Sequence, residues 1–216
     1  MDILFNGPAD GPLCVFAHGA GAPMDSEFMN QFAQGLADLG IRVARFEFPY
    51  MQERRLNGKK RPPNRQPELL LSFEQTLNRI NAPCVLIGKS MGGRMASILA
   101  SEFEKTDRVN TLIKGVCALG YPFHPQGKPE KLRIDHLSDM AVPMSIVQGT
   151  RDPLGNQACV QSLLDENKIP LSLTTLWLDD GDHDLKPRKK SGFTHEQHLQ
   201  EAIEFTASFI KFCFSK

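Results

Sequence analysis

A serine between glycines is the strongest chemical signal in this sequence. The segment GKSMGG (88–93) fits the pattern G-x-S-x-G, and it stands between the apolar run CVLIG and the helical stretch RMASILASEF. A serine that projects from a sharp strand-to-helix turn needs small neighbours, because the backbone there is strained. The N–H groups that begin the next helix can stabilise charge on a reacting carbonyl oxygen. The pattern therefore predicts Ser90 as a nucleophile.

Two other interpretations of this segment are weighed. The five-residue pattern also arises by chance, in which case it is a glycine-rich turn with an incidental serine. The segment also resembles the end of a phosphate-binding loop, G-x-x-x-x-G-K-[ST]. That loop needs a glycine five positions before Gly88, where Pro83 stands, so the nucleotide-binding interpretation fails.

A serine hydroxyl is a weak nucleophile until a base takes its proton. Asp152 follows the apolar run 143–149, and His183 follows the run 173–178 in a glycine turn. We predict His183 as the base and Asp152 as the acid that orients it, in the chain order expected for a strand–elbow–helix serine. A turn or capping role for Asp152 and a solvated acidic turn around His183 are the alternatives. A metal site is disfavoured, because no further histidine or cysteine cluster has ligand spacing.

A small-residue turn, HGAG (18–21), ends the first main apolar run. Such a turn supplies the second N–H group of an oxyanion hole. We assign the two donors to the backbones of Met91 and Ala20, with Gly21 as the alternative to Ala20, and expect His18 to brace the loop. Further candidates for substrate contact are Gly19, Gly21, Lys89, Tyr121, His124 and Arg54.

Apolar runs of strand length alternate with helical patterns along the chain. The runs are 13–18, 41–48, 84–89, 112–120, 143–149 and 173–178, and residues 2–5 could add one more. Most are continuously apolar, which is typical of strands buried on both faces of a parallel sheet. The run 41–48 is a partial exception, with Arg42, Arg45 and Glu47. The pattern predicts a single domain over residues 1–216, a three-layer αβα sandwich with six to seven mostly parallel strands.

Helical periodicity places an amphipathic helix behind Asp25 and Ser26 and another over about 194–212. Shorter helices are expected at 67–80, 91–103, 131–139 and 156–166. Residues 49–67 contain four prolines and six Lys or Arg residues, and they are predicted to form a long basic loop. This loop is either a solvated surface or a recognition site for a carboxylate or phosphate on the substrate.

Composition excludes several classes of protein. Lys plus Arg and Asp plus Glu are both 25, so the formal net charge is zero. That balance gives no reason to expect nucleic acid or an anionic membrane as the main partner. The five cysteines are odd in number and mostly lie in apolar runs, which favours buried free thiols in a reducing compartment. With no signal peptide or spanning segment in view, a cytoplasmic location is expected.

The motifs HGAG, GKSMGG, GTRDPLG and GDHDL resemble those of the α/β-hydrolase superfamily, and the length is similar to that of dienelactone-hydrolase-like members. FEFPYM, GKSMGGR and GYPFHPQGKPEKLR resemble a bacterial branch related to testis-expressed hydrolase-like proteins. The resemblance covers roughly residues 12–212. It implies a minimal α/β-hydrolase fold without a large cap and a serine hydrolase that needs no cofactor, acting on carboxylic esters or thioesters of a small substrate. A non-catalytic binding scaffold and an acyltransferase or peptidase with the same triad are the alternatives.

Overall fold

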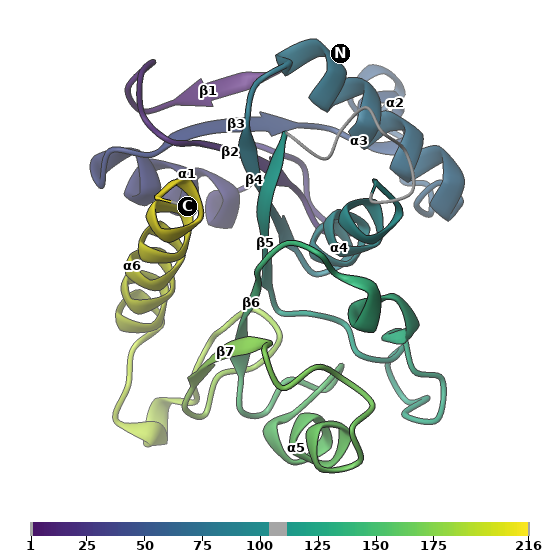
Figure 1. Cartoon of the computed structure of the whole chain (residues 1–216), viewed down its shortest axis with the longest axis vertical. Helices are drawn as coiled ribbons and strands as arrows, with labels where there is room; N and C mark the ends of the chain where they lie inside the picture. Colours follow the sequence, from purple (N-terminus) through teal and green to yellow (C-terminus); the bar gives the residue numbers. More distant parts are fainter. Residues whose placement is uncertain (1, 104–111, 216) are drawn as a thin grey trace.

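Seven strands form one sheet in the computed structural model, in the order β1-β3-β2-β4-β5-β6-β7 (Figure 1). The structure describes residues 2–103 and 112–215. β1 pairs antiparallel with β3, and every other neighbouring pair is parallel. The strands are β1 Leu4–Asn6, β2 Leu13–Ala17, β3 Arg42–Phe46, β4 Cys84–Lys89, β5 Ile113–Leu119, β6 Met144–Gly149 and β7 Thr174–Leu178. The mostly parallel sheet that the apolar runs predict is confirmed.

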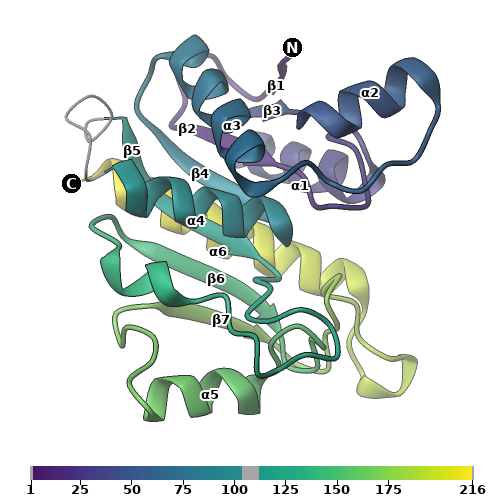
Figure 2. The same ribbon diagram turned by 90° about the vertical axis from the view of Figure 1, so that its right-hand side faces the viewer.

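Helices cover both faces of this sheet, as Figures 1 and 2 show. α1 and α6 pack on one face, and α2, α3, α4 and α5 contribute to the hydrophobic core on the other. The helices are α1 Glu27–Asp38, α2 Pro49–Asn57, α3 Gln66–Ile80, α4 Met91–Phe103, η1 Asp135–Asp139, α5 Gln157–Asp165, η2 Lys189–Ser191 and α6 His195–Phe214, where η marks a 3₁₀ helix. The predicted three-layer αβα architecture is therefore confirmed.

The inner strands β2 to β6 are mostly apolar because each of them contributes side chains to two cores. In β2, Val15 packs toward the α3 and α4 side, and Phe16 packs toward the α1 and α6 side. Successive side chains of a strand point to opposite faces, so a sheet that is covered on both faces has no solvated position. Each fully buried side chain of this size contributes about 1.5–3 kcal/mol to folding.

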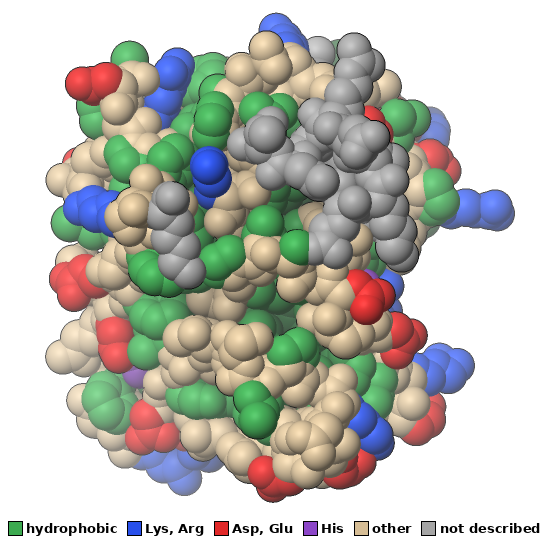
Figure 3. Space-filling view, viewed as in Figure 1, with side chains coloured by type: hydrophobic (Ala, Val, Ile, Leu, Met, Phe, Trp, Pro, Cys, Tyr) green, Lys and Arg blue, Asp and Glu red, His purple; other side chains and the backbone are tan. Residues whose placement is uncertain are grey.

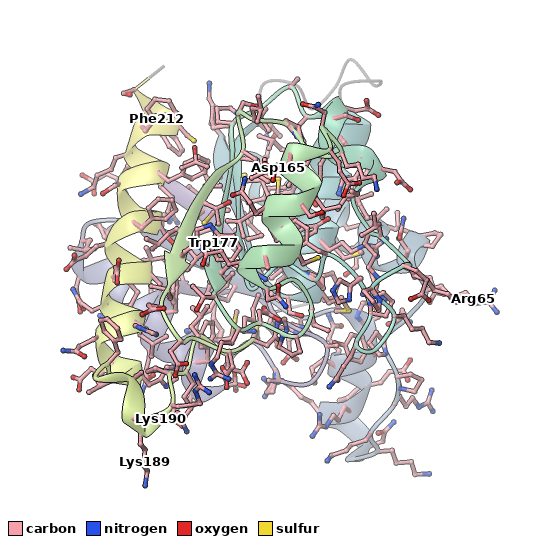
Figure 4. All side chains as sticks on the ribbon, turned by 90° about the horizontal axis from the view of Figure 1, so that it is seen from below. Arg65, Asp165, Trp177, Lys189, Lys190 and Phe212 are labelled. Atoms are coloured by element: carbon pink, nitrogen blue, oxygen red, sulfur yellow. The ribbon has the colours of Figure 1, made fainter. Side chains whose placement is uncertain are left out.

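The C-terminal helix α6 follows its predicted apolar face. It begins at a capping box, in which the Thr194 hydroxyl accepts from the Gln197 N–H and the Gln197 side chain accepts from the Thr194 N–H. Its buried side chains include Leu199, Ile203, Thr206, Ile210 and Cys213. Figure 4 shows α6 and α5 on either side of the edge strand β7, which carries Trp177.

The predicted loop 49–67 is wrong in its first half, which forms helix α2. Pro49 stands at the first helical position, where its fixed φ favours a helix and its missing N–H costs nothing. Tyr50 and Met51 are buried, and the helix ends at Gly58 with φ 70°. Apart from the exposed Leu56, the rest of α2 is polar, so no apolar periodicity reveals it. The helix expected at 131–139 is likewise reduced to the short η1.

The five cysteines are free, four of them buried and Cys159 partly exposed. Charged side chains of both signs are scattered over the face in Figure 3, in keeping with the zero net charge. Within the described residues, no helix has both the length and the apolar character needed to span a bilayer.

Candidate active site

Ser90 occupies a strained turn between the end of β4 and the start of α4. Its φ is +52°, a left-handed value that costs a non-glycine residue on the order of 1–3 kcal/mol. The turn closes only because its neighbours are glycines. A Cβ on Gly88 would lie 2.1 Å from the carbonyl carbon of Gly92, and a Cβ on Gly92 would lie 2.5 Å from the oxygen of Ala17. The sequence thus folds here into the tight elbow that G-x-S-x-G requires.

The structure brings Ser90, His183 and Asp152 into one hydrogen-bonded chain. The Ser90 Oγ lies 2.8 Å from the His183 Nε2, and the His183 Nδ1 lies 2.8 Å from the Asp152 Oδ2. An ionised carboxylate only accepts hydrogen bonds, so the Nδ1 carries the imidazole proton. The Nε2 is then free to accept a proton from the serine hydroxyl. Chemically, this arrangement can deprotonate Ser90 as it attacks an electrophile.

Asp152 is fully buried, and further donors hold its carboxylate. Its Oδ1 accepts from the Leu154 N–H at 2.8 Å, and its Oδ2 accepts from the Gln148 Nε2 at 3.0 Å. The Leu154 contact is the turn role that was weighed as an alternative, and Asp152 combines it with the histidine contact. Sequence reasoning missed Gln148, although a polar residue in the apolar run 143–149 is a visible signal.

The loop that carries His183 is fixed at several points. Gly120 has φ +67°, and a Cβ there would lie 2.9 Å from the His183 oxygen and 3.4 Å from its ring. Asp180 forms ion pairs with Arg151 and Arg188. Hydrogen bonds from Arg188 are the main reason why the pKa of the Asp180 carboxyl lies well below its usual range. The positive charges of Arg151 and Arg188 act in the same direction, and desolvation opposes them. The acidic turn around His183 is therefore partly neutralised by arginines that sequence reasoning did not single out.

The small-residue turn after β2 lies beside Ser90. A Cβ on Gly19 would lie 3.7 Å from the Ser90 Cβ. The buried His18 accepts from the Phe48 N–H through Nε2 at 3.1 Å, so its Nδ1 carries the proton and donates to the Gly19 oxygen at 2.7 Å. Burial lowers the pKa of the His18 imidazole, which favours this neutral form. Through these two hydrogen bonds, the His18 ring braces the loop.

Tyr50 adds a second donor to the same turn. Its hydroxyl lies 3.0 Å from the Ala20 oxygen and 3.3 Å from the Gly19 oxygen. The Gly19 oxygen and the Ala20 N–H belong to one peptide unit, so fixing the oxygen also fixes the direction of the N–H. Within residues 2–103 and 112–215, the Ala20 N–H forms no backbone hydrogen bond.

A buried polar network supports this turn from behind. The Glu47 carboxylate accepts from the Met24 N–H at 3.2 Å and pairs with both the Nε and the Nη2 of Arg55, at 2.6 and 2.7 Å. Arg45 donates to the Met24 oxygen at 2.8 Å. Arg45 and Glu47, two of the three polar residues of the run 41–48, are therefore buried, and both form hydrogen bonds with the backbone of Met24.

The expected substrate-contact residues fall into two groups. Gly19 and Gly21 lie in the turn beside Ser90, and the Arg54 guanidinium lies 3.3 Å from the Gly21 oxygen. In contrast, Tyr121 is fully buried, with its hydroxyl bonded to the Arg133 oxygen.

His124 and Lys89 also turn inward. The His124 side chain is buried, and its Nδ1 donates to the Pro125 oxygen. The Lys89 ammonium bonds to the His183 oxygen at 2.7 Å. Lys89, Tyr121 and His124 are thus buried, and each of them has a hydrogen-bond partner within the protein.

A mostly parallel sheet with a serine at a strained turn after a central strand is the arrangement of α/β hydrolases. Residues 10–211 match the model of a family described as an alpha/beta hydrolase domain. The chain therefore belongs to the α/β-hydrolase family.

Solved structures with the same fold include three of low sequence identity. Est1E from Butyrivibrio proteoclasticus, solved with ferulic acid, has a TM-score of 0.70 and 14% identity, covering 100% of this chain and 96% of its own. A monoacylglycerol lipase from Paleococcus ferrophilus has a TM-score of 0.67 and 15% identity, with 96% and 98% covered. A dienelactone hydrolase from Anabaena variabilis has a TM-score of 0.69 and 14% identity, with 97% and 91% covered.

Proposed function

We propose that this chain is a serine hydrolase that cleaves carboxylic ester or thioester bonds of a small substrate through an acyl-enzyme on Ser90. The observation that carries the proposal is the continuous contact from the Ser90 Oγ through the His183 imidazole to the buried Asp152, at 2.8 Å for each step. The fold and the family membership are compatible with this activity. Est1E, the lipase and the dienelactone hydrolase support an acyl substrate by analogy.

The proposed reaction proceeds in two halves. The Ser90 Oγ attacks the acyl carbon while the His183 Nε2 takes its proton, and the N–H groups of Met91 and Ala20 bind the oxyanion. His183 then gives the proton to the departing alcohol or thiol. A water, deprotonated by His183, then attacks the acyl carbon; the bond between the acyl carbon and the Ser90 Oγ breaks, and His183 returns the proton to the Ser90 Oγ as the acid is released. Asp152 holds the imidazole in the required tautomer. No step of this reaction needs a cofactor.

The free cysteines support a reducing compartment, and we propose a cytoplasmic location.

Labelling with a fluorophosphonate probe tests the proposal. A competent enzyme is modified on the Ser90 hydroxyl, which peptide mass spectrometry locates, and Ser90→Ala and His183→Ala proteins are not labelled. A folded wild-type protein that remains unlabelled at Ser90 would instead support a non-catalytic binding scaffold. Release of p-nitrophenol from p-nitrophenyl acetate, measured in parallel, separates hydrolysis from labelling without turnover.

A further inference from the structure

We propose that Lys89 is a positioning residue that ties the His183 loop to the nucleophile strand and so sets the distance between His183 and Ser90. The inference rests on the proposed function, because it concerns the base of that reaction. It assigns to the residue before the serine a role other than substrate contact.

Among the described residues, the polar contacts of the Lys89 side chain lie on the loop that carries His183. Only 8% of Lys89 is exposed. Its Nζ donates to the backbone oxygen of His183 at 2.7 Å and forms an ion pair with the Asp184 Oδ1 at 3.2 Å. The Nζ also lies 5.8 Å from the centre of the Phe28 ring on α1. Both polar partners therefore belong to the histidine loop, although Lys89 itself is the last residue of β4.

A buried ammonium is costly unless it is paired. Lys89 can be satisfied here only when the His183 loop lies in its observed position, since that loop supplies both polar contacts. Ser90 follows Lys89 directly in the chain, so the same short segment carries the nucleophile and holds the backbone of the base. A displacement of about 1 Å in such a pair can reduce the rate about 100-fold.

The charge of Lys89 is set by groups on three segments. Burial lowers the pKa of the Lys89 ammonium below its ordinary value of 10.5, while Asp184, Asp152 and Asp182 act in the opposite direction. Phe28 faces it from α1 without charge. As the pH rises through the lowered pKa, Lys89 loses its proton and the ion pair with Asp184 disappears. Activity should therefore fall in alkaline solution at a pH below 10.5.

Three variants of the full chain test this role. Lys89→Met removes the ammonium but keeps a similar length. Asp184→Asn removes one partner and leaves the His183 oxygen in place, and Asp184 is 75% exposed, so folding is not endangered. Lys186→Met is the matched control, because it removes a cation from an exposed position of the same loop. We would measure kcat and KM on p-nitrophenyl acetate, the rate of fluorophosphonate labelling from pH 6 to 10, and amide exchange over residues 182–186.

Lys89→Met should lower kcat and the labelling rate about 10- to 100-fold, change KM less than about twofold, and accelerate amide exchange in 182–186. The alkaline fall should vanish in Lys89→Met and move to lower pH in Asp184→Asn, because Asp184 raises the pKa of Lys89. Lys186→Met should stay within about twofold of the wild type. Wild-type rates and exchange in Lys89→Met, or an alkaline fall that neither variant changes, would overturn the proposal.

Failure of the two proposals is distinguishable. If the wild type is not labelled at Ser90, the proposed function fails, and amide exchange in Lys89→Met still decides whether Lys89 holds the loop. If Lys89→Met does not fold, Asp184→Asn and the alkaline profile of the wild type decide instead whether Lys89 holds the His183 loop.

Discussion

Gln148 donates to the same oxygen of Asp152, Oδ2, that contacts His183, at a distance of 3.0 Å. Its amide is fully buried and also bonds to the Gly155 oxygen at 3.0 Å, and its Oε1 accepts from the Tyr121 N–H at 2.7 Å. Gln148 therefore links the carboxylate to the segments that follow β5 and β6. A buried network of this kind is rigid when every member is satisfied and costly when one is removed.

We predict that Gln148→Leu loses about 1–3 kcal/mol of unfolding free energy, because the Tyr121 N–H and one lone pair of Asp152 lose their partner inside the protein. Urea unfolding of the variant and the wild type measures this difference in unfolding free energy. The kcat of the variant should also fall, since Asp152 is less firmly held. Ser138→Ala, at an exposed position of η1, provides a control that should stay within about 0.5 kcal/mol of the wild type. Equal midpoints for Gln148→Leu and the wild type would contradict the structural role.

The catalytic assignment predicts a steep loss for each member of the hydrogen-bonded chain. Ser90→Ala should abolish turnover of p-nitrophenyl acetate, and His183→Ala should nearly do so. Asp152→Asn should lower kcat by several orders of magnitude, because an amide there favours the wrong imidazole tautomer. Far-ultraviolet circular dichroism checks that each variant is folded. Wild-type turnover in Ser90→Ala would refute the assignment.

The strand pattern made most of the fold predictable, since a sheet covered on both faces leaves a continuous apolar run for each strand. The elbow at Ser90 was equally visible, because its glycines are required by contacts under 3 Å. Helix α2 could not be seen, because only Tyr50 and Met51 among its residues are buried. The protein contacts of Lys89 could not be predicted for a similar reason. Its position beside Ser90 suggests substrate contact, and only the three-dimensional path of the 182–186 loop reveals its partners.

Acid should destabilise the fold through His136, which contacts the Ser97 hydroxyl at 2.8 Å. Burial, and secondarily Arg94, lowers the pKa of His136 to about 4. The unfolded chain therefore binds a proton near pH 6.5 that the folded chain takes up only near pH 4, and stability falls as the pH drops through this window. Between pH 7.5 and 5, we expect a loss of about 1 kcal/mol from this group after allowance for its partial exposure. Urea unfolding at both pH values should show a smaller loss in His136→Gln, and an equal loss would contradict the prediction.

Tyr50 should act on the rate and little on substrate binding. Tyr50→Phe removes the hydroxyl that lies 3.3 Å from the Gly19 oxygen and 3.0 Å from the Ala20 oxygen, and it leaves the ring in place. The turn then relies on His18 alone to hold the Gly19 oxygen, so the Ala20 N–H is less well aimed at the oxyanion. We expect kcat to fall about 3- to 10-fold with KM nearly unchanged, given that removal of a whole oxyanion donor costs about 100-fold or more. A rise in KM at constant kcat would instead place Tyr50 in substrate binding.

Among the basic residues of 49–67, Arg54 is the best placed to bind a negatively charged group of a substrate. Its guanidinium lies 3.3 Å from the Gly21 oxygen, whereas Arg55 is occupied by Glu47 and Asp25. An Arg at the rim of the site can bind a carboxylate or phosphate with two hydrogen bonds.

We predict that kcat/KM is higher for an anionic ester than for a matched neutral ester, and that Arg54→Ala removes this difference. Lys60→Ala, an exposed cation beyond the end of α2, should preserve it. The ratio of the two esters at low and at high salt separates a bound anion from general attraction, because screening weakens the latter. Equal kcat/KM values for the two esters in the wild type at low salt would show that the cations of 49–67 are only surface charge.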